Sequence, residues 1–188
     1  MRYVDHKVVI QATPYYEFVY QLNNLFDPQV ALGGHQPMYY DSFAAIYNEY
    51  LVTSAKVIIT VTQDNQQDSP TTVFWGVRDT TTVAPNPTIS NCMEQGNRTI
   101  MQLGFASAGT ACKSITQYTD IGKVHGIKSK LSPKNIPFAA GIGSGPAEGT
   151  YGILQLFSTD ELSRVNCLVT VTIDYNCCFF NRKQMAEN

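Results

Sequence analysis

The sequence predicts an all-β fold, a sandwich or barrel of about eight strands with one or two short helices in the loops between strands. Three observations predict this class. Apolar and polar residues alternate with period two along several segments, turn-forming residues separate these segments, and strands do not alternate regularly with helices. The length of 188 residues fits one domain, which we take as residues 1–188.

The first two strands are expected at 4–11 and 15–22, with a turn-forming Thr-Pro pair between them. A helix is expected next, at 40–49, because large apolar residues recur there at helical spacing. These residues are Tyr39, Phe43, Ile46, Tyr47 and Tyr50. Asp41 can cap the first turn of this helix. We expect the helix to pack Phe43, Ile46 and Tyr47 inward against the sandwich.

The third strand is expected at 52–63, where the alternation is clear. Its apolar face carries Ala55, Val57, Ile59 and Val61. A polar hairpin loop over 64–70 should lead into a strand at 71–78. A short helix is then expected over 88–95, with Ser90 or Asn91 as its cap.

The remaining strands are expected at 98–105, about 113–119, 150–158 and 164–180. The last strand has the longest alternation, with one face formed by Val165, Cys167, Val169, Val171, Ile173 and Tyr175. Between these strands, 123–149 contains Gly and Pro throughout and predicts a large loop. Loops of this size are often involved in contacts, so 123–149 and 64–70 are our candidates for contacts between subunits or for the outer surface of an assembly.

The composition favours a globular protein with a surface that other subunits can cover. Charged residues make up 15% and aromatic residues 11%, which excludes a disordered chain and argues against a helical bundle. The net charge is −2, so bulk electrostatics does not predict binding to nucleic acid or to an anionic membrane. No run of apolar residues is long enough to predict a membrane span.

No motif predicts catalysis, a metal site or a cofactor. The three histidines, His6, His35 and His125, lie at no metal-binding spacing. The five cysteines form no C-x-x-C pair, and their odd number argues against a disulfide framework. The glycine-rich stretch 141–146 lacks the Gly-Lys-Ser/Thr ending of a phosphate-binding P-loop. We therefore expect that the protein is not an enzyme.

One basic cluster is the candidate site for nucleic acid. Lys123, Lys128, Lys130 and Lys134 lie close together with no acidic residue between them. Such a stretch can neutralise phosphates without reading sequence, although a solvated lysine-rich loop has the same composition. Arg2 and Lys7, the basic residues near the N-terminus, complete the candidate set.

The segment Gly34–Val52 carries the most specific pattern in the chain. It has Pro37, an aromatic-Asp pair at Tyr40-Asp41, and Tyr47-Asn48 before the strand that begins near Ser54-Ala55-Lys56. This pattern resembles the capsid proteins of small circular single-stranded DNA viruses that encode a Rep protein, the circovirus-like viruses. The segments 151–157 and 169–180 also resemble the last two strands of that family.

The resemblance implies a single eight-stranded jelly roll, with strands B to I at the positions given above. It implies a protein that self-assembles into a small icosahedral shell of about 60 copies around circular single-stranded DNA. The protein would then occur in the virion, and in the host cytoplasm or nucleus during assembly. Its partners would be copies of itself, the DNA and a host-cell receptor, with no cofactor and no membrane. Such capsid proteins usually begin with an Arg- and Lys-rich arm, whereas this sequence starts almost at the first strand. Any contact of this chain with DNA would then depend on local patches such as the lysine cluster, or on cations.

A second function class fits the same periodicity. A monomeric β-sandwich module could bind carbohydrate or protein, with exposed tyrosines stacking on sugar rings. It would differ from a capsid protein mainly in remaining a monomer in solution. A jelly-roll enzyme would need inward-facing histidines and carboxylates in a cluster, for which three isolated histidines give little material.

Overall fold

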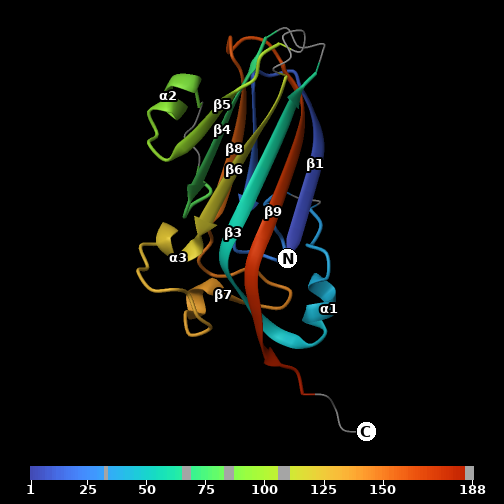
Figure 1. Cartoon of the computed structure of the whole chain (residues 1–188), viewed down its shortest axis with the longest axis vertical. Helices are drawn as coiled ribbons and strands as arrows, with labels where there is room; N and C mark the ends of the chain where they lie inside the picture. Colours follow the sequence, from blue (N-terminus) through green and yellow to red (C-terminus); the bar gives the residue numbers. More distant parts are fainter. Residues whose placement is uncertain (32–33, 65–68, 83–86, 106–110, 185–188) are drawn as a thin grey trace.

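Two antiparallel sheets pack face to face in the computed structural model, which describes residues 1–31, 34–64, 69–82, 87–105 and 111–184 (Figure 1). Sheet A has the order β1-β9-β3-β6, with the short β7 paired to β3. Its strands are β1 (Arg2–Gln11), β3 (Tyr47–Gln63), β6 (Cys112–Asp120), β7 (Ala139–Gly141) and β9 (Val165–Arg182). Sheet B has the order β2-β8-β4-β5. Its strands are β2 (Tyr15–Gln21), β4 (Thr71–Arg78), β5 (Arg98–Gln102) and β8 (Tyr151–Ser158).

This topology is that of a jelly roll. The strands predicted as B, I, D and G form sheet A, and those predicted as C, H, E and F form sheet B. The chain therefore crosses between the sheets repeatedly, and each sheet is built from segments far apart in the sequence. The predicted all-β jelly-roll fold is confirmed, and the three-residue β7 is an addition to the eight predicted strands.

The core lies between the sheets, where the predicted apolar faces meet. Val57, Ile59 and Val61 of β3 are fully buried, as are Val171 and Ile173 of β9. Sheet B contributes Val73, Trp75, Leu154 and Leu156 to the same cluster. The period-two pattern thus identified the inner faces of β3 and β9 correctly. The signal is strong because a slip of one residue would turn the whole apolar set to solvent.

The helix predicted at 40–49 is much shorter than expected. The helix α1 spans Tyr40–Ala44, and its N-cap residue Tyr39 makes no side-chain cap hydrogen bond, so Asp41 is not the cap. Residues from Tyr47 onward belong to β3, where they pair with the end of β9. The apolar spacing has another cause, because three of these residues, together with Tyr40, surround one ring. The rings of Tyr40, Phe43, Tyr47 and Tyr50 all lie within 6.5 Å of the Phe179 ring.

The predicted inward packing of this helix is only partly correct. Phe43 stacks on Phe179 at 4.9 Å between ring centroids but remains 41% exposed, and Ile46 is 45% exposed. The second helix, α2 (Ile89–Met93), begins after Thr88, whose hydroxyl accepts a hydrogen bond from the Asn91 backbone N–H at 3.2 Å. The predicted caps, Ser90 and Asn91, were therefore wrong by two or three positions.

The segment 123–149 contains more regular structure than the predicted loop. It includes the end of α3 (Ile121–Val124), the 3₁₀ helix η2 (Ile136–Phe138) and β7. The strand predicted at 98–105 ends at Gln102, and the strand predicted at 113–119 extends over Cys112–Asp120. Most of the predicted hairpin loop at 64–70 lies outside the described residues.

Candidate nucleic-acid interface and assembly surface

The six predicted basic residues fall into two groups at opposite edges of sheet A. Lys123 lies in α3, which packs near β3 and β6. It is followed along the chain by Lys128, Lys130 and Lys134, and all four lysines are exposed. Arg2 and Lys7 lie in β1, at the other edge of the sheet. The structure therefore does not bring the six residues together into one patch.

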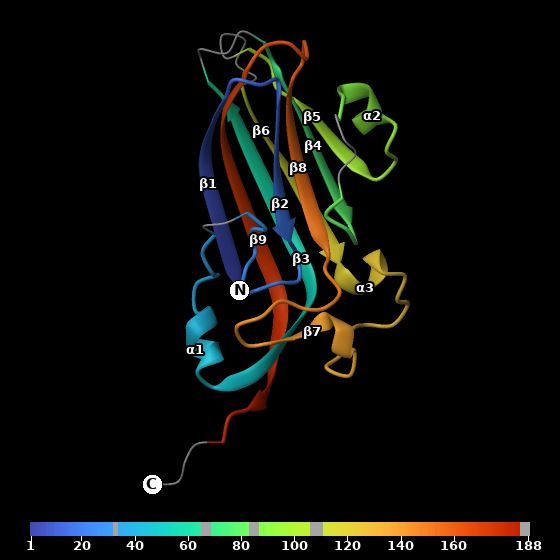
Figure 2. The ribbon, with the colours of Figure 1, turned by 180° about the vertical axis from the view of Figure 1, so that it is seen from behind.

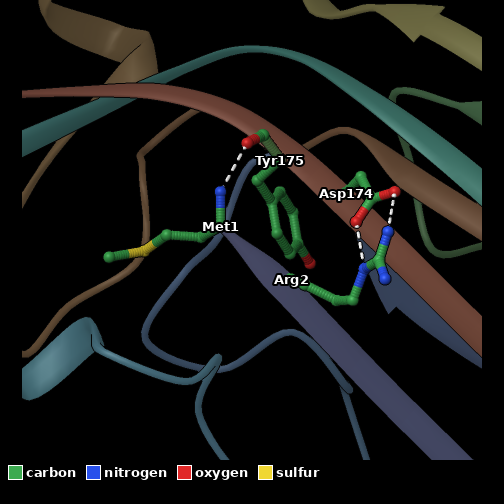
Figure 3. A network of polar contacts seen from close by, with 4 residues as sticks. All are labelled: Met1, Arg2, Asp174 and Tyr175. Atoms are coloured by element: carbon green, nitrogen blue, oxygen red, sulfur yellow. Dashed lines mark hydrogen bonds and ion pairs between the residues drawn. The ribbon is translucent and has the colours of Figure 1, made fainter.

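Arg2 and Lys7 are engaged within the protein. They point to opposite faces of β1, because their positions differ in parity. The Arg2 guanidinium donates two hydrogen bonds to the Asp174 carboxylate, at 2.6 and 2.9 Å, beside the Met1 amine that donates to the Tyr175 carbonyl at 2.8 Å (Figure 3). These hydrogen bonds from Arg2 hold the pKa of Asp174 below its ordinary value. Arg2 is thus already neutralised by an adjacent carboxylate.

Lys7 also has partners inside the sandwich. Its Nζ atom lies 3.3 Å from an Asp5 carboxylate oxygen and 5.2 Å from the ring centroid of Phe18. The same Asp5 oxygen accepts a hydrogen bond from the Tyr20 hydroxyl at 2.8 Å. Lys7 therefore balances a buried carboxylate between the sheets, a role that the sequence pattern did not reveal.

Two arginines that the sequence pattern did not single out lie near one of these lysines, Lys123. Arg78 ends β4 and Arg98 begins β5, and both line the same cavity of about 600 Å³ as Lys123. The three residues are far apart in the sequence. The register of β4 with β5, in which Gly76 pairs with Arg98, brings the two arginines together, and the contact of β5 with β6, next to α3, adds Lys123. Lys128, Lys130 and Lys134 do not line this cavity.

The strands β1, β9, β3 and β6 of sheet A lie toward the viewer in Figure 1, and their outward side is the outer face of sheet A. We define this outer face by the even-numbered residues of 2–10, 56–62, 112–118 and 168–174, which the strand register places side by side. Charged residues occur at one end only, in the row formed by Arg2, Asp174 and Lys56. The rest carries Thr, Ser, Cys, His and aliphatic side chains, of which Val8 is 67% and Ile10 is 65% exposed. Such a surface can be covered with little desolvation of charge.

The segment 123–149 is anchored at the far end of the sandwich from the β8–β9 turn (Figure 2). The Tyr50 hydroxyl lies 2.8 Å from the Ser144 carbonyl, and the Tyr40 hydroxyl accepts a hydrogen bond from the Gly143 N–H at 3.2 Å. Burial raises the pKa of Tyr50 above its ordinary value, so this hydroxyl stays protonated. The anchoring leaves Ile136 projecting from the segment with 78% of its surface exposed.

An apolar cavity of about 740 Å³ adjoins the Arg2–Asp174 pair. Its lining includes Val4, Met38 and Tyr39, and the latter two are each 68% exposed. Tyr39 adopts a left-handed backbone conformation with φ 71°, which is unusual for a bulky side chain. This end of the molecule therefore presents apolar surface beside the charged row of the outer face.

The histidines are dispersed. His6 contacts Thr170 at 2.8 Å on the outer face, His35 stacks on Tyr3, and His125 contacts Thr150 at 2.9 Å. Across the described ranges, no three His, Cys, Asp or Glu side chains are grouped so that they could hold a metal ion. None of the helices in the described part of the chain has the length and apolar character needed to span a bilayer.

Comparisons with known proteins identify the fold. No protein-family model matches the sequence, and no curated protein matches it. Among solved structures, a chain of the empty virus-like particle of cowpea mosaic virus superposes with a TM-score of 0.50 at 10% identity, covering 98% of this chain and 87% of that chain. A chain of Desmodium yellow mottle tymovirus gives a TM-score of 0.49 at 11% identity, covering 100% and 90%. At this identity, the likeness to the cowpea mosaic virus chain shows a shared jelly-roll fold.

Proposed function

We propose that this protein is a viral capsid protein, formed by one jelly-roll domain over residues 1–188. It self-assembles into a small icosahedral shell of about 60 copies. The shell encloses a circular single-stranded DNA genome, as the resemblance of 34–56 to circovirus-like capsid proteins implies. The protein then occurs in the virion, and in the cytoplasm or nucleus of the host cell while shells assemble.

The observation that carries this proposal is the jelly roll itself. Its two sheets, ordered β1-β9-β3-β6 and β2-β8-β4-β5, are built from strands that run along the chain from Arg2 to Arg182. The similarity to the chain from the cowpea mosaic virus particle covers 98% of this sequence, which supports one jelly-roll domain over these residues. A rigid sandwich of this kind can meet several neighbours in a closed shell at once.

The surface chemistry supports association between copies. The outer face of sheet A carries uncharged residues over most of its area. Apolar residues are also exposed beside its charged row, at Met38 and Tyr39, and on the segment 123–149, at Ile136. Contacts of this kind bury area without desolvating charge. Each contact can be weak, because a subunit in a shell is held by several neighbours at once. We assign contacts between copies to the segment 123–149 and to the loop 64–70.

The net charge of −2 limits how this chain can hold DNA. Many copies of this chain add no positive charge to a shell that encloses a polyanion, so packaging by this chain depends on local basic patches or on bound cations. Arg2 and Lys7 are paired with Asp174 and Asp5, and therefore contribute little free charge. The exposed lysines of 123–134 are better placed to supply positive charge to DNA phosphates.

The test is the size of the purified full chain in solution, by light scattering with negative-stain microscopy. Uniform closed shells would support the proposal, and a ratio of absorbance at 260 and 280 nm typical of nucleic acid would support packaging. A 20.8 kDa monomer at every salt concentration and protein concentration tested would overturn it. In that case a monomeric binding module becomes the better hypothesis, and a glycan array is the next measurement.

A further inference from the structure

A polar cavity is lined by residues from the end of β4, the start of β5, β6 and α3. The ribbon shows these elements on one side of the sandwich (Figure 1). Its lining includes three cationic side chains: Arg78 of β4, Arg98 of β5 and Lys123 of α3. Asp79 is the one carboxylate in the described lining. The volume of about 600 Å³ is large enough to admit a small anionic group with its water. The cavity thus combines space, polarity and an excess of positive charge.

The two arginines share one neutral acceptor. The Gln95 Oε1 atom accepts from Arg98 Nε at 2.8 Å and from Arg98 Nη2 at 2.6 Å, and it also accepts from Arg78 Nη2. Among the described residues, neither arginine forms an ion pair with a carboxylate, and Lys123 forms none either. Two guanidinium groups on one amide oxygen repel each other, so an anion placed between them would be strongly attracted.

Arg98 has given up part of its hydration without gaining a counter-charge. Burial, together with the charge of Arg78, acts to lower the pKa of Arg98. Its remaining partner is the oxygen of Gln155, a fully buried residue whose amide nitrogen lies 3.4 Å from a Glu17 carboxylate oxygen. The neutral amide of Gln155 therefore stands between the Arg98 guanidinium and the Glu17 carboxylate. A charged group kept partly desolvated in this way costs stability unless a ligand compensates it.

A hydrogen-bond acceptor in the same lining is also unsatisfied. Gln117 of β6 lines the cavity, and its buried Oε1 atom has no hydrogen-bond partner among the described residues. An acceptor of this kind needs a donor. A ligand that fits both features carries an anionic oxygen and an N–H or O–H group, as a nucleotide unit does with its phosphate and its base. Sulfate has the charge without the donor.

We propose that this cavity binds a phosphate group of single-stranded nucleic acid, with Arg78 and Arg98 donating to the phosphate oxygens and Lys123 at the rim. The choice of a strand as the source of the phosphate rests on the proposed capsid function, whereas the anion site itself does not. The guanidinium groups present planar pairs of donors, which suits a phosphate. Lys128, Lys130 and Lys134 are exposed outside the cavity and make a weaker, diffuse contribution.

The test measures the binding of an oligothymidylate with a fluorescent end label to the full chain. Fluorescence anisotropy at fixed salt concentration reports the affinity. The variant pair Arg78→Gln with Lys123→Gln should weaken binding by about tenfold or more. The matched control, Lys130→Gln with Lys134→Gln, removes the same charge outside the cavity and should weaken binding by less than about threefold. The cavity variants should also lower the slope of log affinity against log salt by about 0.7 for each phosphate that they no longer neutralise.

Three outcomes would overturn the proposal: no binding by the unmodified chain, equal weakening by both variant pairs, and binding of thymidine monophosphate with no binding of the strand. Inorganic phosphate and sulfate serve as competitors. Phosphate should compete at the cavity, and a loss of that competition in the cavity variants would support the site. Circular dichroism checks the fold. If Arg78→Gln unfolds the chain, Lys123→Gln alone is compared with Lys130→Gln alone.

The assembly state is measured on the same samples, so the two proposals can fail separately. Shells that form without any affinity for the strand would overturn the phosphate site and leave the capsid function intact. A monomer that binds the strand through Arg78 and Lys123 would support the site and count against the capsid function.

Discussion

Gly152 of β8 lies directly against the indole ring of Trp75 in the neighbouring strand β4. A Cβ atom at position 152 would stand only 2.5 Å from the Cζ2 carbon of the ring. Trp75 is fully buried at the centre of the core, so its ring has no free space into which to move. The strand β8 therefore needs a residue without a side chain at this position, although glycine is unfavourable within a strand.

Gly152→Ala should destabilise the fold by about 1–3 kcal/mol, because overpacking a dense core forces side chains and backbone to shift. Urea unfolding followed by tryptophan fluorescence measures the change, and Trp75 is the single tryptophan of the chain. Gly96→Ala is the matched control, since a Cβ atom there meets nothing within 4 Å. It should change stability by less than about 0.5 kcal/mol. Equal unfolding midpoints for the two variants would contradict the packing argument.

Tyr20→Phe should destabilise the protein by about 1–3 kcal/mol, because it removes a donor from a buried carboxylate. The Tyr20 hydroxyl donates to Asp5 at 2.8 Å across the space between the two sheets, and burial raises the pKa of Tyr20 so that it keeps its proton. Thermal unfolding by circular dichroism tests the effect. Tyr39→Phe removes the same atom from a residue that is 68% exposed, and it should leave stability almost unchanged. A similar loss in both variants would show that the buried contact contributes nothing specific.

The long strands were predictable because their signal is local. In a strand with one buried face, apolar residues recur at every second position. The strands β3 and β9 keep that pattern over their buried lengths. The start of β3 was missed because Tyr47–Tyr50 owes its strand conformation to pairing with 179–182, more than 120 residues away. Nothing in the spacing of the aromatic residues distinguishes a helix from a ring cluster around Phe179.

The candidate site shows the same division between local and distant information. The cluster of four lysines in 123–134 is visible in the sequence, and all four are exposed in the structure. Arg78 and Arg98 each look like the end of an ordinary strand. Their association with Lys123 depends on which edge strands of the two sheets meet, and that is a property of the jelly-roll topology rather than of any short segment.

Asp160→Asn should lower the melting temperature at neutral pH, and the difference should shrink progressively in acid. The Asp160 carboxylate accepts hydrogen bonds from Ser158 Oγ, from Ser163 Oγ and from the backbone N–H groups of Leu162 and Ser163, which hold its pKa below the ordinary value. A group with a lowered folded-state pKa stabilises the fold above its unfolded pKa of about 3.9, and this contribution is lost as the pH falls below that value.

Differential scanning fluorimetry from neutral pH to pH 2 would follow both curves. Because local hydrogen bonds hold the Asp160 carboxylate, the difference between the curves should persist when salt is added at neutral pH. A difference that stays constant down to the lowest pH would show that the charge of Asp160 is not what stabilises the β8–β9 turn.

Ile136→Asp should prevent shell formation and leave the subunit folded. Ile136 projects from the segment 123–149 with 78% of its surface exposed, so the change removes no core contact. If this segment forms contacts between copies, a buried and unpaired carboxylate there costs several kcal/mol at each contact, and the symmetry of the shell repeats that cost. Met93→Asp is the matched control, because Met93 is an exposed apolar residue of α2, outside the proposed contact segments. Light scattering should find shells for Met93→Asp and only small species for Ile136→Asp, with the same circular dichroism spectrum for both. Intact shells of Ile136→Asp would remove 123–149 from the candidate contacts and leave the outer face of sheet A as the surface to test.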